Sequence, residues 1–123
     1  MSFIKSHHPV KHLKSFKYAF SGILHSLYHE ANFRIQIVIT IFAVIGGLYF
    51  QISPSEWSVL IIAFASLLSA EVLNTSIENF ADFLIPKKSE VVRVVKDLAA
   101  GFVLINAVAC FLILIIIFGK YLI

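Results

Sequence analysis

Three apolar runs separated by short polar stretches constrain this chain more than any other feature. They occupy residues 35–50, 57–70 and 98–118, and hydrophobic residues make up 59% of the sequence. Only 14% of the residues are charged, whereas a soluble domain carries about 25%. Because about 20 mainly apolar residues cross a bilayer as a helix, the sequence predicts an all-α integral membrane protein with three transmembrane helices.

Helix-terminal signals place the three spans within a single domain of 123 residues. We expect the first span at about 33–51, the second at about 54–85 and the third at about 97–118. Ser53 and Glu56 flank Pro54 in the pattern of a capping box with proline at the first helical position. The second helix is therefore expected to begin at Pro54 and to end before Pro86, since proline cannot continue a helix.

The segment before the first span has the pattern of a helix that lies on a membrane surface. Between about residues 10 and 29, apolar residues from Val10 to Leu27 recur at spacings of three and four, and lysines lie between them. A basic amphipathic helix of this kind binds an anionic lipid surface. We favour lipid over nucleic acid as its partner because a span follows directly.

Lysine and arginine are unevenly distributed about the spans. Lys120 lies on one side, and the other nine lie on the opposite side. The positive-inside rule then predicts that the N-terminus and the loop between the second and third spans face the cytoplasm. These nine residues are Lys5, Lys11, Lys14, Lys17 and Arg34 before the first span, and Lys87, Lys88, Arg93 and Lys96 before the third.

Four polar residues form a stripe on the second span. At about 100° per residue, Glu71, Asn74, Glu78 and Asp82 fall within about 80° of one another on a helix. An ionisable group at the bilayer centre costs about 2.5–3.5 kcal/mol on insertion scales, so such groups usually line a site or a polar interface. Counted from Trp57, Glu71 lies about 21 Å along the helix and Glu78 about 32 Å along it. The two glutamates are therefore expected at different depths.

These depths favour phosphoryl transfer to a lipid. Glu30, just before the first span, and Glu78 are expected at the same interface, and Mg²⁺ prefers one or two carboxylates together with substrate phosphates. Lys96 is placed to neutralise charge on a transferring phosphoryl group, and Glu71, deeper and partly desolvated, to accept a proton from a lipid headgroup hydroxyl. The sequence contains no P-loop motif.

Three blocks of the sequence resemble the prokaryotic diacylglycerol kinase and undecaprenol kinase family. They are Glu30 to Arg34, Glu71 to Asp82 and Lys96 to Gly101, which occur in the family's order and at its distances. The resemblance implies a small lipid kinase of a bacterial plasma membrane that uses ATP and Mg²⁺. It also implies a homotrimer of three-span protomers with a surface helix, whose sites are shared between neighbours.

The resemblance assigns roles to individual residues. It implies that Glu71 is the catalytic base and that Glu30 and Glu78 bind Mg²⁺. Further assignments are Asn74 and Asp82 as supporting residues, Lys11, Tyr18, Glu30, Glu78, Lys96 and Asp97 as ATP contacts, and Ser15, Phe16, Asn32, Arg34, Glu71 and Ala100 as lipid contacts. The chain departs from the family pattern in two places: Lys87-Lys88-Ser89 replaces a frequent Glu-Tyr-His run, and Gln36 stands where an acid is frequent.

Other interpretations of the polar residues remain open at this point. The stripe residues also suit a polar interface between helices of an oligomer, and buried acids also line ion paths in small membrane channels. Within the kinase interpretation, undecaprenol and diacylglycerol are the two main acceptors. The amino-acid sequences of the second and third blocks are slightly closer to those of the undecaprenol kinases.

The central prediction concerns Glu71. Replacing Glu71 by Gln removes the proposed proton acceptor without changing the size of the side chain, so we expect lipid phosphorylation to be abolished. The variant should still insert into the membrane and assemble, as measured by membrane fractionation and size-exclusion chromatography. Retained kinase activity in Glu71→Gln would exclude Glu71 as the base.

Overall fold

A computed structural model describes residues 9–123 and is all-helical over that range. It contains α1 (Pro9–His29), α2 (Ala31–Phe50), α3 (Pro54–Leu84) and α4 (Glu90–Leu122). By length and composition, α2, α3 and α4 are each apolar enough to cross a membrane. The expectation of an all-α protein with three candidate spans is confirmed. Lys5, which contributes to the charge count above, lies outside the described residues.

The start of α3 follows the predicted capping box. The Ser53 hydroxyl accepts a hydrogen bond from the Glu56 backbone N–H at 3.2 Å, and the Glu56 carboxylate accepts one from the Ser53 backbone N–H at 3.2 Å. Pro54 occupies the first turn, where its missing N–H is not needed. These local bonds satisfy two backbone donors that would otherwise lack partners, so α3 begins where the sequence places it.

A tight turn joins α2 to α3. Gln51 has φ 53° and ψ 54°, the left-handed conformation that commonly ends a helix. The N–H of Ile52 then donates to the carbonyl of Gly47 at 3.1 Å, and the Ile52 side chain is buried. The chain therefore reverses direction within a few residues and brings α2 and α3 side by side.

The helix α4 begins earlier than the expected third span. Residues 91–97, which mix apolar and charged side chains ahead of that span, form the first two turns of α4. No glycine or proline interrupts the chain between Glu90 and Ala100, so nothing in the sequence separates the amphipathic segment from the apolar one. At 1.5 Å per residue, α3 with 31 residues is about 46 Å long and α4 with 33 residues about 50 Å long.

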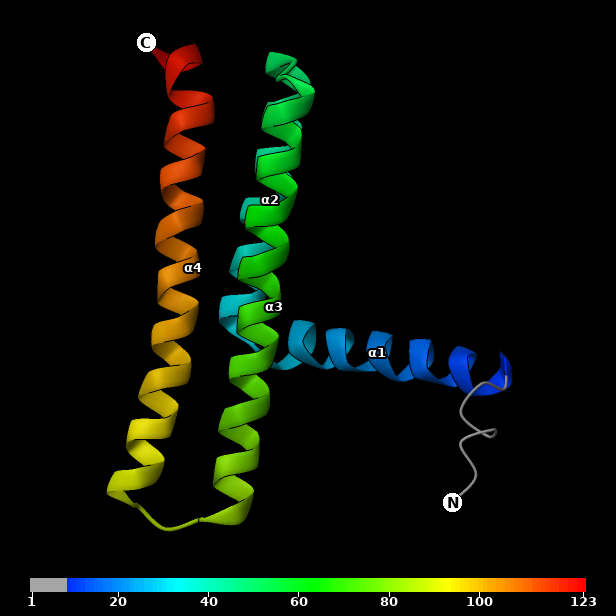
Figure 1. The fold of residues 1–123 in the computed structure, drawn as a ribbon, viewed down its shortest axis with the longest axis vertical. Coiled ribbons are helices and arrows are strands. Elements are labelled where there is room, and N and C mark those ends of the chain that lie inside the picture. The colour runs from blue at the N-terminus through cyan, green and yellow to red at the C-terminus, as the bar shows by residue number, and fades with distance from the viewer. Residues whose placement is uncertain (1–8) are drawn as a thin grey trace.

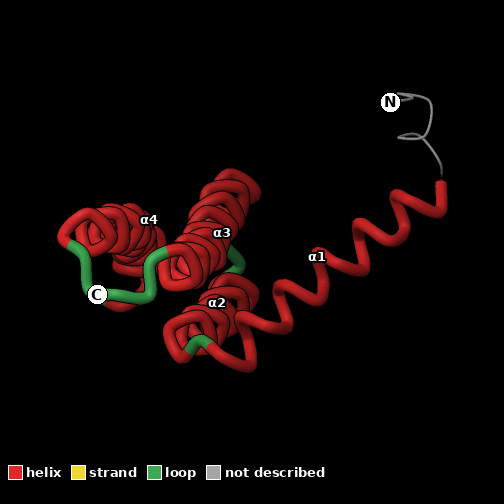
Figure 2. Tube along the Cα trace, turned by 90° about the horizontal axis from the view of Figure 1, so that it is seen from below, coloured by secondary structure: helices red, strands yellow, loops and turns green. Residues whose placement is uncertain are grey.

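The three candidate spans, α2, α3 and α4, stand side by side as a bundle, and α1 projects from them at a steep angle (Figure 1). Seen along the bundle, α3 lies between α2 and α4 (Figure 2), and its most extensive packing is with α4. One end of the bundle carries the turn at residues 51–53 and the C-terminus, and we call it the turn end. The other carries the loop at residues 85–89, and we call it the loop end. α3 and α4 extend past the level of α1 at the loop end (Figure 1).

The core of the bundle lies toward the turn end. Leu60, Phe64 and Leu67 of α3 are almost fully buried, and they pack with Cys110 and Ile117 of α4. Most other large apolar side chains on α2, α3 and α4 are exposed. In a bilayer such side chains face lipid rather than water, so an apolar exterior is what a membrane-spanning bundle requires.

The turn end is fastened by polar and aromatic contacts. Lys120 near the end of α4 forms a salt bridge of 2.9 Å with Glu56 in the first turn of α3. The rings of Phe50 and Tyr121 stack with centroids 4.8 Å apart. These contacts hold the last turn of α4 against the turn between α2 and α3.

Gly47 supplies a test of how closely α2 and α3 approach. A Cβ at this position would lie 2.6 Å from the Trp57 ring and 3.1 Å from Ile52. We expect Gly47→Ala to destabilise the protein by about 1–3 kcal/mol, the usual cost of overpacking, although alanine favours helix by about 1 kcal/mol. Thermal unfolding in detergent micelles measures the effect.

Gly119→Ala is the matched control for this change. No neighbouring atom lies within 4 Å of a Cβ built at Gly119, so this variant should retain or slightly raise the unfolding temperature. Equal unfolding temperatures for the two variants would contradict the close approach at Gly47.

Candidate functional site

Glu30 lies in the elbow between α1 and α2. It is a single non-helical residue with extended backbone angles, φ −112° and ψ 110°. One guanidinium nitrogen of Arg34 donates to the carbonyl oxygens of Leu27 and Tyr28, each at 3.0 Å. These are carbonyls of the last turn of α1, which have no partner within the helix. Arg34 therefore ties the end of α1 to the start of α2 and fixes the direction in which α1 leaves the bundle.

Glu71 lies deeper in the bundle and contacts α2. Its side chain is only 3% exposed, and one carboxylate oxygen accepts a hydrogen bond from the Gln36 amide nitrogen at 3.1 Å. The charges of Glu30 and Glu78 are close enough to act on Glu71. This carboxylate is therefore buried and is held by a hydrogen bond from one side-chain amide.

The bond between Gln36 and Glu71 also fixes the relative level of α2 and α3. The helices run in opposite directions, so Glu30, six residues before Gln36, lies about 9 Å nearer the loop end. Glu78, seven residues after Glu71, lies about 10 Å nearer the same end. The contact thus supports the predicted placement of Glu30 and Glu78 at one level and of Glu71 at another.

Asn74 and Thr75 add buried polar groups beside Glu78. The Asn74 amide nitrogen donates to a Glu78 carboxylate oxygen at 3.2 Å, which fits the supporting role expected for Asn74. The Asn74 amide oxygen and the Thr75 hydroxyl are buried and have no hydrogen-bond partner among the described residues. Leaving such a group unpaired costs about 1–3 kcal/mol, so this face of α3 is built to meet a further polar group.

The loop end carries charged pairs between and along α3 and α4. Lys96 forms a salt bridge with Asp82 across the two helices. Arg93 forms one with Asp97 at 2.9 Å and another with Glu90 along α4. A cavity of about 590 Å³ opens beside these pairs, and its lining includes Asp82, Arg93, Lys96 and all three residues of the loop run Lys87-Lys88-Ser89.

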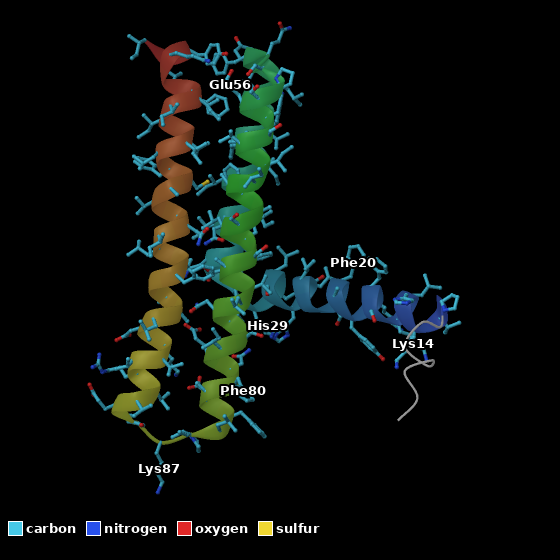
Figure 3. The ribbon with its side chains drawn as sticks, viewed as in Figure 1. Lys14, Phe20, His29, Glu56, Phe80 and Lys87 are labelled. Carbon is cyan, nitrogen blue, oxygen red and sulfur yellow. The ribbon has the colours of Figure 1, made fainter. Side chains whose placement is uncertain are left out.

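The residues expected on α1 lie far from this charged end within one chain. Lys11, Ser15, Phe16 and Tyr18 are exposed, and Lys11 is 19 positions, or about 28 Å along the helix, from Glu30. α1 points away from the bundle (Figures 1 and 2), with Phe20 and Lys14 on opposite sides of it (Figure 3). Asn32 and Ala100 are also exposed. A single chain therefore brings together Glu71, Gln36, Asn74 and Glu78 but not the α1 residues.

The carboxylates at the level of Glu30 and Glu78 suit a hard divalent ion. Within residues 9–123, no three His, Cys, Asp or Glu side chains gather closely enough to hold a metal by themselves. Mg²⁺ does not need such a cage, because it retains water and takes phosphate oxygens as ligands. Glu78, whose orientation is set by Asn74, offers an oxygen ligand of the required kind.

Sequence reasoning missed two side chains that the structure places in the site. Arg93 contacts Asp97 and Glu90, and it was signalled by acids three positions before it and four after it. Gln36 was signalled by its polarity inside an apolar run. Its partner on α3 follows only from the packing of the two helices, which the sequence does not give.

Comparison with known proteins matches one family model and two relatives. A family model for prokaryotic diacylglycerol kinase matches residues 17–118. An undecaprenol kinase from Bacillus subtilis is 32% identical over 105 residues, which cover 85% of this chain and 85% of the relative. A diacylglycerol kinase from Synechocystis sp. is 28% identical over 102 residues, which cover 82% of this chain but only 58% of the relative.

Arg34 provides a test of the elbow. A membrane surface restrains the tilt of α1 but not its direction within the plane, so loss of the Arg34 bonds should free that direction. We expect Arg34→Ala to broaden the distance distribution between spin labels at Lys14→Cys and Val44→Cys, measured in a Cys110→Ala background. Lys17→Ala, which removes an exposed cation from α1, should leave the distribution narrow. Equal widths in both variants would contradict the role of Arg34.

Proposed function

The chain belongs to the prokaryotic diacylglycerol kinase family and is a lipid kinase, and we propose that it transfers the γ-phosphoryl group of ATP to a lipid primary hydroxyl with Mg²⁺. The acceptors proposed are undecaprenol and diacylglycerol, the lipids in the names of its two relatives. Undecaprenol is favoured, because the undecaprenol kinase is matched over the larger share of its own length. Family membership favours this enzyme over a channel subunit.

The observation that carries the proposal is the separation of the carboxylates by depth. Glu71 is buried in the bundle and held by Gln36. Glu30 and Glu78 lie about 10 Å nearer the loop end. A hydroxyl attached to a membrane lipid reaches the first level from the bilayer, whereas a nucleotide reaches the second from water. The two substrates of a lipid kinase need such an arrangement.

The proposed reaction uses these side chains in distinct roles. Glu71 accepts the proton of the lipid hydroxyl as its oxygen forms a bond to the γ-phosphorus, and the bond from that phosphorus to the β-phosphate oxygen breaks to release ADP. Mg²⁺, when bound by Glu30 and Glu78 together with the phosphates, supplies neutralising positive charge. Positioning and electrostatics provide most of the acceleration in phosphoryl transfer.

Nucleotide binding is proposed at the loop end. Lys96, 34% exposed in its side chain and paired with Asp82, would contact the ATP phosphates, and Asp97 would contact the nucleotide. The salt bridge from Arg93 orients Asp97 at 2.9 Å. The lining of the adjoining cavity of about 590 Å³ includes three lysines and one arginine against two acids, Asp82 and Glu90. This excess of positive charge suits an anionic ligand.

A homotrimer is proposed to complete the site. The α1 residues Lys11 and Tyr18, expected to bind ATP, lie far from Lys96 of the same chain. We therefore propose that α1 of one copy lies beside Lys96 of a neighbouring copy, so that one nucleotide site contains residues of both. Lipid contacts are proposed for Ser15, Phe16, Asn32, Arg34 and Ala100. Since one nitrogen of Arg34 caps α1, a lipid contact would use the others. The membrane proposed is the bacterial plasma membrane, with the loop end and α1 on the cytoplasmic side.

Purified protein in lipid nanodiscs tests the function directly. With radiolabelled ATP and Mg²⁺, we expect label to be transferred to undecaprenol and, at a lower rate, to diacylglycerol. Chelation of Mg²⁺ by EDTA should stop the transfer, and restoring Mg²⁺ should recover it. Absence of labelled product with both lipids would overturn the proposal.

Substitution of two comparable lysines can distinguish an effect on nucleotide binding from an effect on the stability of the helix pair. Lys96 and Lys120 each form a salt bridge from α4 to an acid of α3, at opposite ends of the bundle. We expect Lys96→Met to raise the KM for ATP at least about tenfold, the effect of losing about 1.4 kcal/mol of binding, and Lys120→Met to leave it unchanged. Equal ATP dependence in the two variants would contradict the role of Lys96.

A further inference from the structure

Gln36 is the one side chain of α2 that forms a hydrogen bond with a carboxylate of α3 among the described residues. Its amide nitrogen donates to one oxygen of Glu71 at 3.1 Å. One helical turn later, the Thr40 hydroxyl donates to the Gln36 carbonyl oxygen of the backbone at 2.7 Å. Because an ionised carboxylate only accepts hydrogen bonds, the nitrogen end of the amide must face Glu71.

From this contact we propose that Gln36 is a positioning residue for Glu71 in phosphoryl transfer, an inference that rests on the proposed function. The bond occupies one carboxylate oxygen and fixes the plane of the carboxyl group. The second oxygen then has a defined direction in which to receive the proton of the lipid hydroxyl. A base oriented in this way needs no rearrangement when the hydroxyl arrives.

A gain in folding stability does not explain why position 36 carries a glutamine. Its side-chain amide oxygen is buried and has no hydrogen-bond partner among the described residues, and such a group costs about 1–3 kcal/mol. Hydrogen bonds between membrane helices recover on average about 0.6 kcal/mol. An apolar side chain at this level of α2 would avoid the unpaired oxygen, but it would leave the buried Glu71 carboxylate without this donor, at a similar cost. The observed glutamine is therefore explained by what its nitrogen does to Glu71.

The charge of the residue at position 36 also matters. Glu30 from the elbow and Glu78 from α3 already place negative charge near Glu71, and no Lys or Arg side chain forms a salt bridge with Glu71 among the described residues. A glutamine adds a donor there without adding a fourth negative charge. Where the family has an acid at this position, only its protonated form can donate to an ionised Glu71, whereas glutamine donates without needing that proton.

Two variants test the proposal in nanodiscs with wild-type protein alongside. In Gln36→Leu we expect kcat to fall about tenfold while the KM for ATP and the unfolding temperature stay near the wild-type values. In the isosteric Gln36→Glu, which places the acid frequent in the family at this position, we expect more activity to remain than in Gln36→Leu, because a protonated glutamate can still donate to Glu71. The KM for ATP should again be unchanged. A merely structural role would instead lower the unfolding temperature or change kcat and KM together.

Thr40→Val is the matched control on the same helix. It removes a polar group one turn away that does not reach Glu71, so its kcat should equal the wild-type value. Wild-type kcat in both Gln36 variants, beside an active wild-type protein, would overturn this inference alone. A wild-type protein inactive on both lipids would overturn the proposed function and this inference with it.

Discussion

The thickness of the bilayer governs this protein, because two of its helices are longer than the membrane core they cross. α2, with 20 residues, is about 30 Å long and matches the hydrocarbon core. α3 and α4 exceed it by about 15–20 Å. The tight turn after α2 aligns α2 with α3 at the turn end, and the contacts of Lys120 and Tyr121 hold α4 there. The excess length of α3 and α4 therefore lies at the loop end. This one-sided excess separates the buried level of Glu71 from the water-exposed level of Lys96.

The sequence predicted the features that depend on local chemistry. Ser53, Pro54 and Glu56 determine the start of α3 through bonds between near neighbours, and the polar stripe from Glu71 to Asp82 follows from helical geometry alone. The predicted third span at about 97–118 lies within α4. The sequence did not show that the helix starts before that span, because an amphipathic segment and an apolar one differ in composition but not in backbone conformation. The helix bounds follow backbone signals, and composition only indicates how much of each helix lies in lipid.

Contacts between different helices could not be predicted from the sequence. Arg34 was assigned to the lipid, and the structure commits one of its nitrogens to the end of α1. Gln36 was noted only as a departure from the family pattern, and the structure bonds it to Glu71, 35 positions away. Both outcomes depend on how α1, α2 and α3 are oriented relative to one another. A hydrophobic pattern defines which face of a helix is apolar, but it does not define which residues of two faces meet.

The unpaired polar atoms give the strongest reason to regard one chain as an incomplete unit. The Asn74 oxygen, the Thr75 hydroxyl and the Gln36 amide oxygen are all buried without partners in the described chain, and each costs about 1–3 kcal/mol in that state. All three atoms lie within a few turns of Glu71, whereas at the turn end Lys120 and Glu56 pair with each other. Groups supplied by bound substrates or by a neighbouring copy would remove this cost. The same neighbour would bring an α1 to the loop end, so the proposed trimer would complete both the hydrogen bonding and the nucleotide site.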